Sequence, residues 1–418
     1  AEERRHHSII EEIPDETAIE IAAMVGETSF VLLPNGETVE VPRFPGLEVQ
    51  RSADRMYPFD HKTVVIDRST FPLPIRSDEP SRVDVEGVAL RVLGWVRAGV
   101  QAEDVDRRAK SLDELPSLAA SATTTALGKQ PIDRGRYRPG DVVGSGGVEY
   151  ARETQLRGHR GVSIERRDTS ARSTTEPTSG RDVQLALDIL LQARVRALLD
   201  PAVGLAVVQP WHNNQSVEVG TPLNGAAVVL DVATGDVLAM VSTPGTDRAT
   251  LQTNPQTLLD DPANPLLHRA IGAAYAPGSI AKAMVLCGAT TFGHYTLGER
   301  ISCPGHLLPG RNDIYRCWIY RDRFGFATHD AVLGEPPDDI EALGVSCNIF
   351  YYTLGRRMGG KTIDRTYRAF GLGERFDFGF GFEHDGRIGA AGMELGVSDA
   401  ILMGIGQGPV DWTPLHAA

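Results

Sequence analysis

Apolar positions in the first part of the chain are arranged for short elements separated by turns. Residues 14–27, PDETAIEIAAMVGE, space them as a helix does, with Asp15 as an N-cap and Gly26 as a stop. The next stretch, TSFVLLPNGETVEVPRF, has two apolar runs around Pro-Asn-Gly and predicts a hairpin. Residues 115–141 are rich in small residues and predict a flexible insertion.

The second part of the chain has longer apolar runs. Residues 181–200, RDVQLALDILLQARVRALLD, predict a short strand that becomes an amphipathic helix, with a domain boundary near residue 183. Residues 225–244, GAAVVLDVATGDVLAMVSTP, predict a buried antiparallel hairpin. A helix that begins near YAPGSIAKAM and further helical segments follow, which favours an α+β fold over a doubly wound sheet.

Composition and charge narrow the function classes. The 418 residues are 41% hydrophobic and 23% charged, and the formal net charge is −13. This balance is typical of a folded domain and argues against a duplex nucleic-acid binder, which needs a basic face. No run reaches the roughly 18 apolar residues of a membrane helix, and AEERRHHSII lacks the apolar segment of a signal peptide.

A glycine-rich stretch invites comparison with nucleotide-binding motifs. Residues 140–158, GDVVGSGGVEYARETQLRG, lead from a turn into a helix, but Glu149 stands where GxGxxG needs its last glycine. A structural turn is therefore the preferred interpretation.

The four cysteines are Cys287, Cys303, Cys317 and Cys347, and no CxxC is present. Cys303 and Cys317 flank a Pro/Gly-rich loop and are the favoured disulfide pair, with two free thiols as the alternative. His306 and His329 lie in or just beyond that loop, but the spacing supports a metal site poorly. No metal and no cofactor is expected.

Ser279 and Lys282 are the first candidate catalytic residues. They are i and i+3 after Pro277-Gly278, so on a helix they share a face near its N-terminus. A nucleophilic serine needs a base, and burial lowers the pKa of a lysine toward the range in which it can act as one. On its own this pattern also fits an ordinary helix cap.

Ser346 and Asn348 form the second candidate pair. They begin an apolar segment, GVSCNIFYYTLGRRMGG, where polar side chains need partners. One interpretation is a cap plus a satisfied core amide. The other is a hydroxyl that relays a proton and an amide that holds a substrate carbonyl in the same cleft as Ser279.

Several segments, in this order, resemble the class B penicillin-binding proteins, most closely those of the elongation (penicillin-binding protein 2) type. FPGLEVQRSADRMYPF and RVLGWV resemble the N-terminal pedestal, and GSGGVEYARETQLRGHRG the segment that links it to the catalytic domain. GAAVVLDVATGDVLAMVSTP, YAPGSIAKAM, GVSCNIFYYTLGRRMG and GIGQGPVDWTPLHAA resemble successive parts of the transpeptidase domain, including its Ser-x-x-Lys and Ser-x-Asn motifs.

The resemblance implies a mixed α/β pedestal over residues 1–183 and a transpeptidase domain over 184–418, an antiparallel sheet flanked by helices. It implies a peptidoglycan D,D-transpeptidase of cell elongation, with Ser279 as nucleophile, Lys282 as its base, Ser346 as proton shuttle and Asn348 as substrate holder. The implied partners are stem peptides ending in D-Ala-D-Ala, an amine acceptor, β-lactams, and a glycan-polymerising membrane protein of the shape, elongation, division and sporulation (SEDS) type. The implied location is the outer face of the cytoplasmic membrane, with an anchor upstream of Ala1.

The sequence departs from the family pattern in its third motif, Lys-Thr/Ser-Gly. GGKTIDR has Ile363 where glycine is needed and comes too early in the chain, so it is interpreted as a surface helix start. The transpeptidase domain is therefore expected to be incomplete at its C-terminus. Two alternatives stay open: a catalytically degenerate scaffold that binds morphogenesis partners, and a serine β-lactamase or β-lactam sensor.

Overall fold

A computed structural model describes most of the chain. The described residues are 13–25, 27–44, 47, 55–73, 75–125, 131–138, 141–165, 172–212, 216–390 and 392–418. They divide into two compact units, Ala1–Tyr57 and Pro58–Ala418. No described helix is both long enough and apolar enough to cross a membrane.

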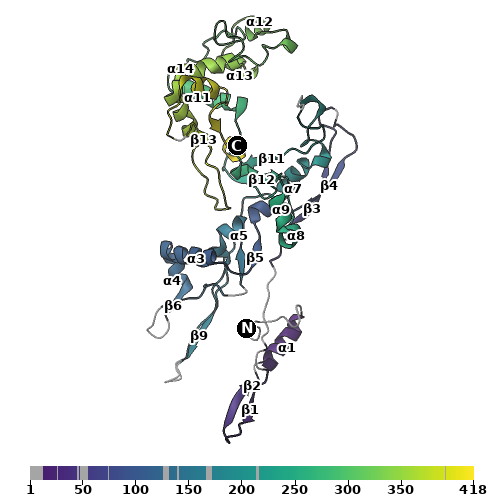
Figure 1. The fold of residues 1–418 in the computed structure, drawn as a ribbon, viewed down its shortest axis with the longest axis vertical. Coiled ribbons are helices and arrows are strands. Elements are labelled where there is room, and N and C mark those ends of the chain that lie inside the picture. The colour runs from purple at the N-terminus through teal and green to yellow at the C-terminus, as the bar shows by residue number, and fades with distance from the viewer. Residues whose placement is uncertain are drawn as a thin grey trace. The chain divides into compact units, whose positions relative to one another are not determined.

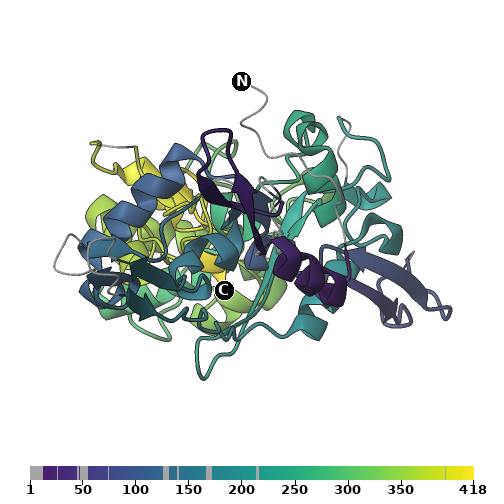
Figure 2. The ribbon, with the colours of Figure 1, turned by 90° about the horizontal axis from the view of Figure 1, so that it is seen from below.

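The first unit contains one helix and one hairpin. Helix α1 (Asp15–Val25) begins at the predicted cap residue itself, and the predicted stop, Gly26, lies outside the described residues. Strands β1 (Thr28–Leu32) and β2 (Thr38–Pro42) pair antiparallel and form the purple hairpin in Figure 2. In this pair Phe30 lies opposite Glu40. The predicted helix and hairpin are thus confirmed.

The second unit begins with short hairpins and helices. Strands β3 (His61–Ile66) and β4 (Ser81–Glu86) pair antiparallel, and the pairs β5–β8, β6–β7 and β9–β10 follow. The remaining elements of this region are α2 (Leu90–Leu93), β5 (Val96–Ala98), α3 (Ala102–Glu114), α4 (Pro116–Ala122), β6 (Thr123–Thr125), β7 (Pro131–Asp133), β8 (Val142–Gly144), α5 (Gly147–Ala151), α6 (Glu153–Leu156), β9 (Val162–Glu165) and β10 (Arg172–Thr175).

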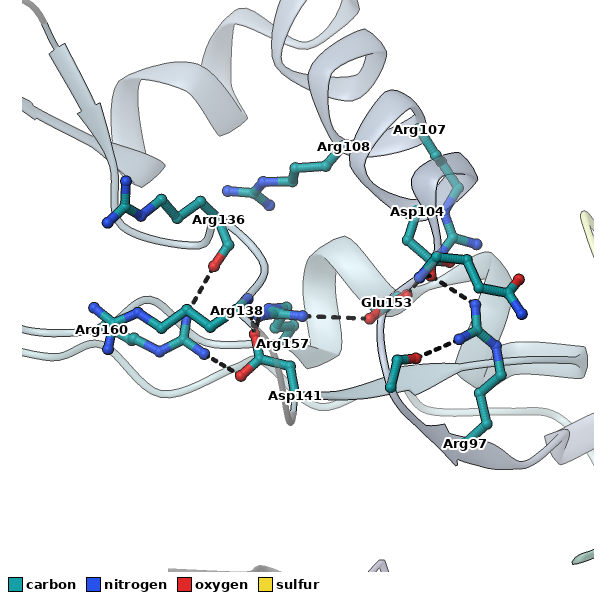
Figure 3. A network of polar contacts seen from close by, with 12 residues as sticks. Arg97, Asp104, Arg107, Arg108, Arg136, Arg138, Asp141, Glu153, Arg157 and Arg160 are labelled. Carbon is teal, nitrogen blue, oxygen red and sulfur yellow. Dashed lines mark hydrogen bonds and ion pairs between the residues drawn. The ribbon is translucent and has the colours of Figure 1, made fainter. Parts of the chain in front are cut away.

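A network of ion pairs joins these small elements (Figure 3). Glu153, nearly buried at the start of α6, pairs with Arg107 of α3 at 2.7 Å and with Arg157 at 3.7 Å. Asp141 in turn pairs with Arg157 and Arg160. These partly buried charges join α6 to α3, and they join the segment after α6 to the residue just before β8.

The hairpin of β11 (Gly225–Leu230) and β12 (Val237–Thr243) packs against α7 (Ile189–Leu198). The buried side-chain amide of Gln192 donates to the carbonyl oxygens of Val88 (3.1 Å) and Met240 (3.0 Å), and it accepts from Met240 N (2.8 Å). One glutamine therefore satisfies three backbone groups that burial would otherwise leave unpaired.

The rest of the chain is mainly helical. Helices α11 (Ala281–Thr291), α14 (Asn348–Ala369) and α15 (Val397–Met403) pack on one another around the largest apolar core (Figure 1). The other elements of this region are α8 (Arg248–Thr253), α9 (Pro255–Asp260), α10 (Arg269–Gly272), α12 (His329–Leu333), α13 (Asp339–Gly344), β13 (Arg387–Ile388), β14 (Val410–Asp411) and α16 (Pro414–Ala417).

The fold is α+β, as predicted, and most predicted elements are confirmed. Two predictions were wrong. Residues 115–141 are not a flexible insertion in their described part, because that part contains α4, β6 and β7. Residues 126–130 and 139–140 lie outside the described residues. Residues 181–187 form no strand, and α7 begins only after its N-cap Asp188. The boundary near residue 183 stays a prediction.

Candidate functional site

Ser279 lies on an exposed 3₁₀ turn, Gly278–Ile280, that leads directly into α11. Gly278 has a φ of 62° and its N–H donates to the carbonyl oxygen of Gly406 at 2.7 Å. A Cβ atom at Gly406 would stand 2.2 Å from the carbonyl oxygen of Gly278. Only glycine at position 406 therefore allows the two backbone segments to come this close. The segment after α15 therefore holds the turn that presents the Ser279 hydroxyl.

Lys282, one turn further into α11, has a side chain that is almost fully buried. Its Nζ donates to three oxygens at 2.8 Å each: the Ser346 carbonyl, the Ser346 hydroxyl and Oδ1 of Asn348. An ammonium has three N–H donors, and all three are used here. The Asn348 Nδ2 donates on to the carbonyl oxygen of Arg316 at 3.3 Å, which fixes the orientation of the amide.

Burial lowers the pKa of Lys282 to about 8, against the opposing attraction of nearby thiols. At pH 7 about a tenth of this group is therefore neutral and able to accept a proton. A neutral amine keeps two N–H bonds and gains a lone pair, so one of the three contacts is given up when the group loses its proton. The centroid of the Tyr351 ring lies 5.6 Å from Nζ.

Ser346 has a φ of 52°, in the left-handed region that residues other than glycine rarely adopt. Such a conformation costs about 1–3 kcal/mol. Its carbonyl and its hydroxyl both accept from Lys282, and those contacts offset the cost. The strained backbone thus turns two oxygens of one residue toward the same amine.

Of the four residues singled out in the sequence, three meet in direct contact: Lys282, Ser346 and Asn348. Ser279 lies one turn before Lys282 on the same helical segment, and among the described residues its hydroxyl makes no hydrogen bond to Lys282. The Lys361-Thr362 pair lies inside α14 just after a break at Gly359 (φ 66°), with Lys361 exposed, as its interpretation as a surface helix start predicted.

A second cluster lies directly beside this one and was missed in the sequence. Cys303, Cys317, His329 and Cys347 are all buried, and one ligand atom of each lies within 4.8 Å of the others. The predicted disulfide between Cys303 and Cys317 is wrong for this structure, in which both thiols are free and turn toward His329. The Nδ1 atom of that histidine is 3.3 Å from Cys317 Sγ and 3.6 Å from Cys303 Sγ. His306 instead stacks on Tyr320.

The chemistry of this donor set fits a metal ion. Three thiols and one imidazole are the ligand set of tetrahedral structural zinc sites. Hydrogen bonds from the Cys303 and Cys347 thiols lower the pKa of the Cys317 thiol well below its usual range, while the contact with Cys317 raises the pKa of Cys303 to about 11. The cluster therefore already stabilises one thiolate, and a divalent cation would stabilise the rest.

The position of Cys347 connects the two clusters. It stands between Ser346 and Asn348, whose side chains bind Lys282. A metal ion held by these four residues would fix the backbone at Cys347, and with it the positions of Ser346 and Asn348. The available sequence signal was this cysteine inside the Ser-x-Asn segment, but the ligands are too widely spaced along the chain to indicate a site without the fold.

Comparison with known proteins agrees with this arrangement. Residues 225–418 match the family described as the penicillin binding protein transpeptidase domain. The peptidoglycan D,D-transpeptidase MrdA of Escherichia coli K12 is 27% identical over 390 residues, which are 90% of this chain and 49% of that protein. The MrdA of Acinetobacter baumannii is 26% identical over 305 residues, 69% of this chain and 41% of that protein. The chain thus spans less than half the length of these curated relatives.

Solved structures show the same fold. Pseudomonas aeruginosa PBP2 in complex with WCK 5153 has a TM-score of 0.55 at 21% identity, covering 79% of this chain and 60% of that chain. The complex between PBP2 and MreC from Helicobacter pylori gives a TM-score of 0.59 at 22% identity, covering 81% of this chain and 56% of that chain.

Proposed function

We propose that this chain is a penicillin-binding protein of the class B, penicillin-binding protein 2 type, and that it is a peptidoglycan D,D-transpeptidase acting through an acyl-serine intermediate. The observation that carries the proposal is the binding of Lys282 to both Ser346 and Asn348, one helical turn from an exposed Ser279. A buried amine, a hydroxyl and an amide beside an exposed serine are the groups that acyl transfer needs.

In the proposed reaction the Ser279 hydroxyl attacks the carbonyl carbon of the penultimate D-Ala of a stem peptide. The peptide C–N bond breaks, an ester forms on Ser279, and the terminal D-Ala leaves as the amine with an added proton. An amine of a second stem peptide then attacks the ester and releases the serine, which makes the cross-link. The hydroxyl regains its proton in this second step.

The proton transfers fall to Lys282 and Ser346. Lys282, neutral once it gives up one of its three contacts, takes the proton of Ser279. The Ser346 hydroxyl, 2.8 Å from the same nitrogen, passes a proton to the leaving amine. Asn348, held by Lys282 and by the Arg316 carbonyl, orients the donor peptide with its amide. β-Lactams, as cyclic amides, would acylate the same serine.

The test is the mass of the intact full-length protein after exposure to a penicillin, followed by peptide mapping. We expect one adduct, on the peptide that contains Ser279, and none in Ser279→Ala. Ser398→Ala, which removes another exposed serine hydroxyl, serves as the matched control and should still react. A folded full-length protein that never forms an adduct would refute the catalytic proposal.

The second candidate function is a scaffold that binds morphogenesis proteins. It is favoured by the structural relative from Helicobacter pylori, which forms a complex with MreC. In either case the proposed partners include a SEDS-type glycan polymerase, and the proposed location is the outer face of the cytoplasmic membrane. Retained partner binding in Ser279→Ala, together with loss of cross-linking, would separate the two functions.

A further inference from the structure

Two partly buried arginines, Arg91 and Arg196, lie where the segment around α2 meets α7 and the end of β12. Arg91 Nη2 donates to the carbonyl oxygen of Pro244 at 3.2 Å, and Arg196 Nη1 donates to that of Ser242 at 3.1 Å. Because these two acceptors are two residues apart, the two guanidinium groups lie close together. Both line one small cavity, beside Gly245 and Thr246.

These cations have no carboxylate partner among the described residues. Arg91, Arg196 and the buried Arg269 form no ion pair there, and their hydrogen bonds go to backbone carbonyl oxygens. Asp200 attracts Arg196 only from beyond ion-pair distance, and its carboxylate caps the turn at Ala202. Burial, and then the charges of Arg196 and Arg269, lower the pKa of Arg91 to about 9.

The N–H donors of the Arg196 guanidinium are not all hydrogen-bonded within the described residues. Arg196 Nε is buried and has no hydrogen-bond partner among the described residues. Its guanidinium lies against the loop after β12, so closely that a Cβ at Gly245 would fall 1.6 Å from Nη2. Buried cations in proteins are normally paired with a negative charge, since burial without one is costly. The site therefore lacks a negative charge.

We propose that this cavity binds one small inorganic anion of the size of chloride. Its volume is about 20 Å³, which is roughly the space of a single water-sized particle. A phosphate ester is too large for a cavity of this volume. A water molecule in the same space would accept from the arginines without neutralising their charges.

The bound anion would connect parts of the chain that are far apart in sequence. Arg91 belongs to α2, before the transpeptidase domain, and Arg196 belongs to α7, which packs on β12. An anion between the two guanidinium groups would replace their mutual repulsion by attraction of both to the anion. It would thereby hold α2 on the hairpin of β11 and β12. This inference is independent of the proposed enzymatic activity.

The experiment is thermal unfolding of the full-length protein in sodium chloride and in sodium gluconate at equal ionic strength. Gluconate is too large for the cavity, so the comparison separates specific binding from general screening. We expect chloride to raise Tm by about 2–4 °C with a saturable dependence on concentration. Arg196→Met should lose this increment. Arg194→Met, which removes an exposed arginine two residues away on the same helix, should keep it.

A second measurement does not depend on how well a variant folds. Crystals of the unaltered protein grown with bromide should show an anomalous peak between Arg91 and Arg196. Equal Tm values in the two salts together with no peak would overturn the proposal, as would a chloride increment that persists in both Arg91→Met and Arg196→Met. A carboxylate from another part of the full-length protein at this position would also overturn it.

Discussion

The amine nitrogen of Lys282 lies 2.8 Å from the hydroxyl of Ser346, a residue 64 positions away in the chain. The same nitrogen holds the Ser346 carbonyl and the Asn348 amide oxygen. One buried lysine thus joins the start of α11 to the start of α14. In the proposed mechanism this contact is also the path by which protons move.

Replacing Lys282 by methionine keeps an unbranched side chain that is one atom shorter and removes the base. We expect the second-order rate of acylation by a penicillin to fall by about 10²–10⁴-fold, the usual contribution of a positioned general base. Stopped-flow or quenched mass measurements would report this rate. Lys361→Met, which changes an exposed lysine of α14, should leave it within about twofold of the original.

The low pKa of Lys282 makes acylation depend on pH. Only the neutral amine accepts a proton, and its fraction rises as pH increases through about 8, the lowered pKa of this group. The acylation rate should therefore increase from pH 6 to about pH 8 and level off above it, roughly tenfold per pH unit on the acidic side. A profile that is flat across this range would exclude Lys282 as the base.

The cluster of Cys303, Cys317, His329 and Cys347 should bind zinc and stabilise the fold. Removing the metal with a chelator, or changing Cys317→Ser, should lower the free energy of unfolding by at least about 3 kcal/mol, because metal binding is linked to folding. Metal analysis and thermal unfolding would measure both effects. Cys287→Ser, at the exposed free cysteine, is the control and should retain metal and stability.

Glu153 is the nearly buried centre of the network in Figure 3. Changing it to glutamine leaves Arg107 and Arg157 without that charge, and we expect a loss of about 2–4 kcal/mol in the free energy of unfolding. Glu114→Gln, which breaks an exposed ion pair with Lys110, should cost less than about 0.5 kcal/mol. Chemical denaturation would measure the free energy of unfolding of both variants. Equal losses in the two variants would show that burial does not determine the strength of the ion pairs in this network.

Local patterns were enough to predict several elements. The turn residues in PNGE and ATGD indicated two hairpins, and both form, because a turn between two apolar runs is specified within a few residues. The helix after Ser279 was predicted from Pro-Gly and the spacing of the following residues. Residues 181–187 were harder, since an apolar run of that length suits a strand or an extended segment equally well.

The sequence by itself determined which groups the candidate site contains. Ser279, Lys282, Ser346 and Asn348 stand out because their residue types and short spacings have chemical meaning before folding. Only the tertiary structure decided what they contact: that Lys282 uses all three donors on one segment, and that His329 and three cysteines converge behind it. Contacts between distant segments depend on how helices pack, and packing is set by side chains spread over the whole chain rather than by any local pattern.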